Sequence, residues 1–154
     1  MSQNSPAWIS FPDASKGTLK VIIGIKKVGK GGVKMEKMEV KNLGSPEEVR
    51  TFDKGKVELV KIGGRVIGRA TFQPGWKWSE SVKPLVKTKS CEAPHFQYHV
   101  SGTLRVRMDD GTEKDLKPGD VSVLPTGHDA WVVGNEPVVV VDFQGMIDYA
   151  KANR

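Results

Sequence analysis

The sequence predicts an all-β domain, either a sandwich or a barrel. From residue 56 to residue 143, short runs rich in β-branched and aromatic residues recur at regular spacing, and glycine, proline, asparagine or aspartate separates them. The 154 residues are enough for one domain with its own hydrophobic core. A single cysteine excludes an internal disulfide, and no leader or long apolar segment is recognisable, so we expect a soluble, cytoplasmic protein.

Residues 1–35 are expected to form a basic, partly flexible arm before a single barrel domain at 36–154. Residues 1–45 hold eight lysines and three acidic residues, a charge of +5 out of the net +6, so the body is nearly neutral. Within the arm, Thr18–Ile25 predicts one strand, whereas the glycines and lysines of 26–34 predict a loop. Because no aromatic residues interleave with these lysines, a solvated linker is favoured over nucleic-acid binding. An arm that contacts an acidic partner is the alternative, and its deletion would then abolish that binding.

Helix signals lie at both ends of the barrel region. The run Ser45-Pro46-Glu47 combines a capping hydroxyl, a proline suited to the first helical position and an acid near the positive end of the dipole, so a short helix is predicted near 45–51. A second short helix is predicted over Ile147–Asn153. The strands are expected at Lys56–Ile62, Val66–Phe72, Phe96–Val100, Thr103–Met108, Thr112–Leu116, Val121–Leu124, Trp131–Val133 and Val138–Phe143.

All three histidines and the only cysteine lie between residues 91 and 128. Successive side chains of a strand point to opposite faces, so residues of one parity share a face. The odd face carries a thiol, an amide and two imidazoles, which belong to Cys91, His95, Gln97 and His99. The even face is apolar and consists of Phe96, Tyr98 and Val100. After Gly102 we expect the phase to switch, because Leu104, Val106 and Met108 are apolar while the residues between them are polar, and a glycine permits such a bend.

Two interpretations of the odd face stay open. If it points into a barrel, Cys91 and His95 form a sheltered donor set that His128 can complete from a later strand. Thiol and imidazole ligands suit zinc, iron or copper better than calcium or magnesium. In the other interpretation, Cys91 is a small buried apolar residue and the histidines are satisfied by hydrogen bonds.

The run from about Val57 to Phe143 resembles the cupin superfamily, in particular its small members with one conserved barrel. Gly119, Pro125 and Gly127 match the second half-motif of that family, in which five residues separate the glycine from the proline. The run from Tyr98 to Gly102 matches the strand that ends the first half-motif. The resemblance implies a cupin-type β-barrel, a double-stranded β-helix or jelly roll, and the pairing of two barrels in a homodimer.

The chain departs from the metal pattern of this family. Metal-binding cupins carry His-x-His followed by a glutamate seven residues before the glycine, and here His95 occupies the glutamate position. Cys91 is the one plausible ligand at the His-x-His positions, and His128 lies two residues before the position of the last histidine. The resemblance therefore implies either a rearranged site of Cys91, His95 and His128 or a barrel that has lost its metal. The candidate ions are zinc, iron, copper, nickel and manganese.

Two functions agree with these observations. The first is a small-molecule-binding cupin barrel that holds a transition metal at the rearranged site, with Gln97 and His99 as polar ligand contacts. If it is an enzyme, an oxygenase or isomerase type of reaction is expected. The second is a metal-free ligand-binding or sensory barrel in which Trp76, Trp78 and Trp131 surround an apolar pocket. Packing or a subunit interface is the alternative role of Trp76 and Trp78, whose shared parity sends both rings to one side.

Overall fold

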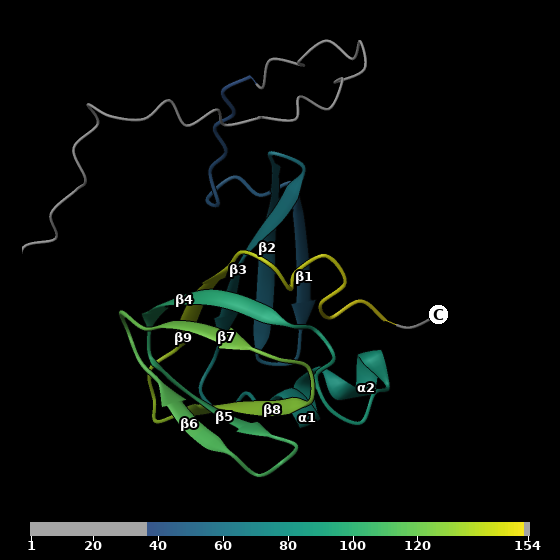
Figure 1. The fold of residues 1–154 in the computed structure, drawn as a ribbon, viewed down its shortest axis with the longest axis vertical. Helices are drawn as coiled ribbons and strands as arrows, with labels where there is room; N and C mark the ends of the chain where they lie inside the picture. The colour runs from purple at the N-terminus through teal and green to yellow at the C-terminus, as the bar shows by residue number, and fades with distance from the viewer. Residues whose placement is uncertain (1–36, 153–154) are drawn as a thin grey trace, which may run out of the picture. The chain divides into compact units, whose positions relative to one another are not determined.

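The computed structural model describes residues 37–152. Within this range the chain forms nine strands and two four-residue helices, which confirms the predicted all-β class (Figure 1), and no helix there is long and apolar enough to span a membrane. The arm and its predicted strand at Thr18–Ile25 lie outside the described residues. The elements are β1 (Glu48–Phe52), β2 (Gly55–Ile62), β3 (Arg65–Phe72), α1 (Trp78–Ser81), α2 (Lys83–Val86), β4 (His95–Ser101), β5 (Thr103–Met108), β6 (Glu113–Leu116), β7 (Val121–Leu124), β8 (His128–Val133) and β9 (Val138–Asp142).

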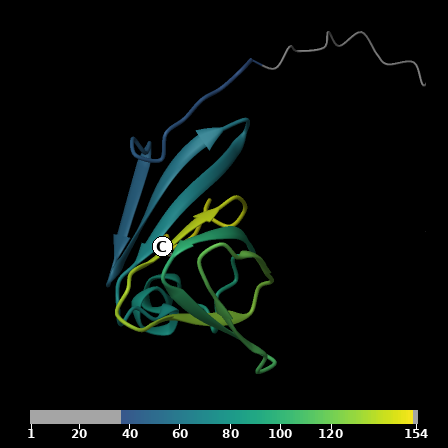
Figure 2. The ribbon, with the colours of Figure 1, turned by 90° about the vertical axis from the view of Figure 1, so that its left-hand side faces the viewer.

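The strands form two antiparallel sheets. The larger sheet has the order β1-β2-β3-β9-β4-β7, and the smaller sheet has the order β6-β5-β8. Consecutive strands β4 and β5 belong to different sheets, as do β7 and β8, so the chain passes repeatedly from one sheet to the other. Figure 2 shows strands β4 to β9 curling into a ring, with β2 and β3 extending beyond it. The ring is a jelly-roll barrel.

Gly102 turns the chain from the larger sheet into the smaller one. Its φ is 67°, and a Cβ atom at this position would lie 2.6 Å from the backbone oxygen of Pro137, so a side chain is excluded. Before the turn, odd-numbered residues such as His95 and His99 are buried; after it, even-numbered residues such as Leu104 are buried. The predicted change of phase at the glycine is therefore confirmed.

The predicted helix near 45–51 is wrong. Glu48–Phe52 is strand β1, which pairs antiparallel with β2 along its whole length. A helix at this position would have only one or two turns before Gly55, and so short a helix is marginal on its own. Pairing with β2 gives the same backbone groups partners within a large sheet, so the tertiary arrangement outweighs the local helix signals.

The predicted helix over Ile147–Asn153 is also wrong, because residues 147–150 form turns and bends and 151–152 have no regular structure. Arg50 of β1 explains this arrangement. Its guanidinium donates to the carbonyl oxygens of Met146 at 3.1 Å, Ile147 at 2.9 Å and Tyr149 at 2.6 Å. These carbonyls are therefore satisfied from another strand instead of by amides one helical turn later. We call residues 143–152 the C-terminal segment.

The two short helices α1 and α2 were not predicted, since four residues are too few to show a helical period. The segment that leads into α1 buries Trp76 and Trp78, which are 2% and 3% exposed. Trp76 stacks on Phe72 with ring centroids 4.0 Å apart. Both indoles belong to the core, so the interpretation of these two residues as part of a subunit interface is wrong.

Candidate metal and ligand site

Backbone pairing holds Cys91 against His128. The Cys91 N–H donates to the carbonyl oxygen of His128 at 2.8 Å, and the Gly127 N–H donates to the carbonyl oxygen of Cys91 at 2.7 Å. Gly127 has a φ of 87°, which suits glycine at this turn before β8. His95 and His128 are the first residues of β4 and β8. The three side chains therefore meet where strands of two different sheets begin.

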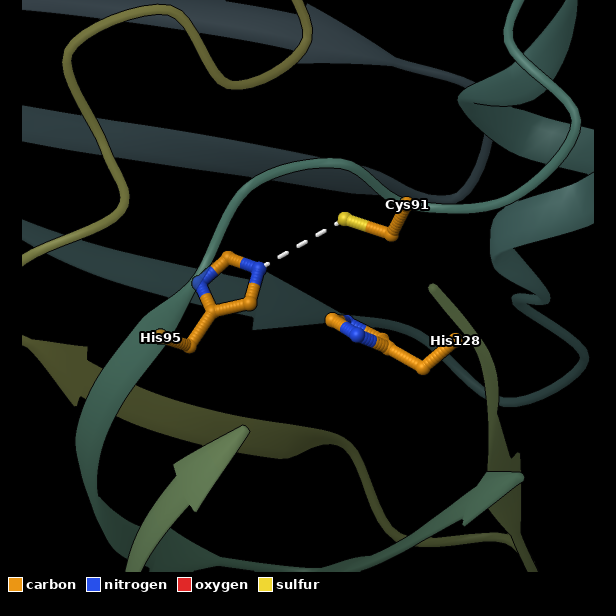
Figure 3. A group of neighbouring side chains, drawn as sticks. All are labelled: Cys91, His95 and His128. Carbon is orange, nitrogen blue, oxygen red and sulfur yellow. Dashed lines mark hydrogen bonds between the residues drawn. The ribbon is translucent and has the colours of Figure 1, made fainter. Parts of the chain in front are cut away.

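Three donor atoms converge inside the barrel (Figure 3). The Sγ atom of Cys91 lies 3.6 Å from Nε2 of His95, and one ligand atom from each of Cys91, His95 and His128 lies within 4.8 Å of the others. All three side chains are buried, at 3–5% exposure. A thiolate and two imidazole nitrogens are a donor set that fits zinc and other borderline transition metals. The structure thus brings together the three candidate ligands that the sequence suggested.

Each imidazole is held through its Nδ1 atom. Nδ1 of His128 donates to the carbonyl oxygen of Pro125 at 2.7 Å, and Nδ1 of His95 forms a short hydrogen bond with the carboxylate of Asp142. These partners orient the rings so that Nε2 of His95 faces the thiol. A hydrogen bond from the second ring nitrogen to a carbonyl or carboxylate is the usual support of a metal-binding histidine.

Asp142 was missed by the sequence analysis. It is the last residue of β9 and is fully buried, and its Oδ1 atom accepts hydrogen bonds from the backbone N–H groups of Gln144 at 2.8 Å and Gly145 at 3.0 Å. A signal was available in the sequence, because Asp142 has the same parity as the buried Val138 and Val140. A carboxylate on the inward face of an apolar strand predicts a buried polar contact.

Charge is concentrated on Cys91, His95 and Asp142. Burial opposes ionisation of the Cys91 thiol, but hydrogen bonds with His128 and His95 outweigh it and lower the pKa of the thiol to about 6. Burial likewise opposes protonation of His95, but Asp142 and the thiolate raise the pKa of its imidazole to about 9. At neutral pH the metal-free site is therefore a thiolate beside an imidazolium. A metal ion would displace the proton on Nε2 of His95, so metal binding must release a proton.

The predicted ligand-contact residues separate into two groups. Gln97, Trp76 and Trp78 line a central cavity of about 20 Å³ together with the three donors. His99 is fully buried away from it, where its Nε2 atom lies 3.2 Å from the side-chain nitrogen of Gln97 and 3.2 Å from Ser122 Oγ.

Trp131 is not part of this cavity. Its ring lies on the outer side of the smaller sheet, where the guanidinium of Arg107 packs over it at 5.6 Å from the centroid, and together they line a separate groove. The structure therefore brings Trp76 and Trp78 to the candidate site but does not bring Trp131 or His99 there.

A larger pocket of about 370 Å³ opens beside the central cavity. Its walls come from α1, α2, the residues around Cys91 and the C-terminal segment. Cys91, Trp78 and Tyr149 line both spaces, so they form the boundary between them. We call the larger space the outer pocket.

No protein-family model matches the chain, and no curated protein matches it. Solved structures share the fold. The ectoine synthase from P. lautus is 14% identical with a TM-score of 0.50, and the match covers 71% of this chain and 80% of that one. A protein of unknown function from Rhizobium leguminosarum is 17% identical with a TM-score of 0.49, over 71% and 98% of the two chains. An oxalate decarboxylase from Bacillus subtilis is 20% identical with a TM-score of 0.46, over 67% and 29%.

The match to the ectoine synthase agrees with the barrel, and the fold that the sequence resemblance implied, the cupin barrel, is confirmed. At such identities the similarities concern the fold alone. The function of this chain has to be argued from its own site.

Proposed function

We propose that this cupin barrel binds a small molecule beside a transition metal that Cys91, His95 and His128 hold. The convergence of the three buried donor atoms within 4.8 Å of one another is the observation that supports the proposal most directly. When bound, the metal would supply a Lewis acid or a site for dioxygen, which suits an oxygenase or isomerase type of reaction. Zinc, iron, copper, nickel and manganese are all compatible with this donor set.

The residues of the chain then have separate tasks. Asp142 and the carbonyl of Pro125 orient the two imidazoles. The outer pocket, with apolar walls that include Val82 and Val86, has the volume to hold the body of a small ligand. Gln97 offers an amide to a polar group that reaches the central cavity.

A metal-free ligand-binding or sensory barrel is the second candidate, and one observation favours it. Cys91, His95 and Asp142 already form a continuous chain of hydrogen bonds. This chain satisfies both nitrogens of His95 without any metal. Measured metal content separates the two functions.

The deciding experiment is elemental analysis of protein purified without chelator, as the wild type and as the Cys91→Ser and His95→Ala variants. We expect about one transition-metal ion per chain in the wild type. Each variant should lose more affinity than the roughly 10–100-fold that removal of an outer-shell partner costs. His99→Gln is the matched control, because His99 is a buried histidine on the same strand face outside the donor set. If the wild-type protein stays free of metal after incubation with each ion, the metal site is rejected and the metal-free ligand-binding barrel becomes the proposed function.

We also propose that the chain forms a homodimer through the outer face of the larger sheet. Strand β7 is the edge of that sheet, and its free edge adjoins exposed apolar side chains at 43–71% exposure. These residues are Phe96, Tyr98, Val100, Val121 and Val123. A second copy related by a twofold axis would pair the two edges and cover both faces at once. Light scattering should show a dimer that Val123→Glu dissociates and that the control Val49→Glu, on exposed β1, leaves intact.

The cytoplasmic location and the role of the basic arm stay predictions. The test of the arm is deletion of residues 1–34, which should leave ligand and metal binding by the barrel unchanged.

A further inference from the structure

Two indole N–H groups in the barrel have no hydrogen-bond partner among the described residues. They belong to Trp76 and Trp78, whose side chains are 2% and 3% exposed. Buried donors without acceptors are rare in native proteins, so each one calls for a physical explanation. The third buried side-chain nitrogen or oxygen without a partner in the described part of the chain is Nδ1 of His99, which does not line the central cavity.

Both indoles line the same small space. Trp76 also borders the groove beside Trp131, and Trp78 also borders the outer pocket, but the central cavity is the space that both share. The position of Trp76 is fixed, because its ring stacks on Phe72 and its carbonyl oxygen accepts a hydrogen bond from the N–H of Val132 at 3.1 Å. Two tryptophans with unpartnered indole N–H groups therefore line the cavity that Cys91, His95 and His128 also line.

The size of the cavity limits what it can hold. Its volume of about 20 Å³ is close to that needed for one water molecule. The outer pocket is far larger, at about 370 Å³, and shares Cys91, Trp78 and Tyr149 with the cavity. The central cavity therefore has room for only a single polar atom of a ligand whose body lies in the outer pocket.

We propose that Trp76 and Trp78 donate hydrogen bonds to one oxygen atom of a small carboxylate or carbonyl compound, beside the metal. This inference rests on the metal site of the proposed function. An indole N–H only donates, so the guest atom must be an acceptor. An oxygen atom can also bind a metal that three protein ligands leave with an open position. The two tryptophans are then polar binding residues as well as part of the apolar core.

The test is nuclear magnetic resonance of ¹⁵N-labelled, zinc-loaded protein titrated with formate and, separately, with azide. The indole N–H resonances are assigned with the Trp76→Phe, Trp78→Phe and Trp131→Phe variants. We expect the signals of Trp76 and Trp78 to move downfield and saturate, while the signal of Trp131, outside the cavity, stays in place. The dissociation constant of formate should rise about tenfold in Trp78→Phe, because one hydrogen bond to a charged ligand is lost, and should not change in Trp131→Phe.

Zinc content, measured on the same samples, separates the two proposals. If the wild-type protein holds one zinc per chain but its Trp76 and Trp78 signals respond to neither anion, this inference is wrong and the metal site is still supported. A protein that binds no zinc or other transition metal overturns both. The shifts in the wild type need no variant, so the test does not depend on whether Trp78→Phe folds normally.

Discussion

His95 and His99 lie four residues apart on the same face of β4, and both are buried, yet they differ in charge. Burial lowers the pKa of the His99 imidazole, whose ring meets the neutral side chains of Gln97 and Ser122. The same kind of burial acts on His95, but Asp142 and Cys91 outweigh it and raise the pKa to about 9. The comparison shows that partners from other strands, and not depth alone, decide the charge of a buried histidine.

This difference divides the interior of the barrel along one strand. The end at His95 carries a thiolate, an imidazolium and a carboxylate, and it borders the outer pocket through Cys91. The end at His99 is neutral and closed. Chemistry and ligand binding are therefore expected at the first end, and packing at the second.

The largest effect is expected from Asp142→Asn, which removes the charge partner that distinguishes His95 from His99. Removal of one partner from a buried ion pair costs about 3–5 kcal/mol, so the free energy of unfolding at pH 7 should fall by about that amount. The affinity for zinc should also fall, by roughly 10–100-fold, because the ring of His95 loses its support. Urea denaturation and zinc titration check both values.

The matched control is Asp148→Asn, which removes an exposed carboxylate that pairs with Lys151. It should change the free energy of unfolding by less than about 1 kcal/mol. Equal effects of the two substitutions would contradict the role given to Asp142.

A second effect is the pH dependence of the metal-free protein. The pKa of His95 is raised in the folded state from 6.5 to about 9, so its stabilisation is complete below pH 6.5 and is lost as the pH rises through about 9. The pKa of Cys91 is lowered from 9.0 to about 6, so its stabilisation is complete above pH 9 and is lost as the pH falls through about 6. Between pH 6.5 and pH 9 the His95 contribution falls while the Cys91 contribution rises by a similar amount, so these two groups should leave the free energy of unfolding nearly constant over that range.

Urea denaturation from pH 5 to pH 10 tests whether stability is constant over this range, and thiolate absorbance at 240 nm reports the ionisation of Cys91 directly. In His95→Gln the absorbance should titrate at higher pH than in the wild type, because the thiolate loses the imidazolium beside it. His99→Gln should not move it. A thiol that titrates near its ordinary pKa in the wild-type protein would contradict the thiolate–imidazolium pair.

The smallest effect is expected from Ser122→Ala at the neutral end of the strand. It removes one hydrogen bond to His99, so the free energy of unfolding should fall by about 1 kcal/mol. Zinc affinity should stay unchanged, because Ser122 does not line the central cavity. A loss of zinc binding in this variant would show that the two ends of the strand are coupled.

Much of the fold could be predicted from the sequence because strand patterns are local. The ranges Thr103–Met108 and Val121–Leu124 agree with β5 and β7 residue for residue, since alternation and flanking turn residues define both ends. The strand predicted at Trp131–Val133 was too short, because β8 begins at His128. The first residues of β8 are polar, so a pattern based on apolar residues does not recognise them as part of a strand, although their backbone pairs with β5.

The sequence by itself determined the inward and outward faces of β4 and their exchange at Gly102, because alternation and a glycine turn are properties of neighbouring residues. It also put Cys91 and His95 on one face and indicated that His128 could join them from a later strand. Only the tertiary structure decided that Asp142 hydrogen-bonds to His95 and keeps its imidazole protonated. The same holds for the hydrogen bonds from Arg50 that hold the C-terminal segment in a non-helical conformation, and for the cavity that Trp76 and Trp78 share. Each of these depends on which distant strands become neighbours, and that choice is made by the packing of the whole barrel.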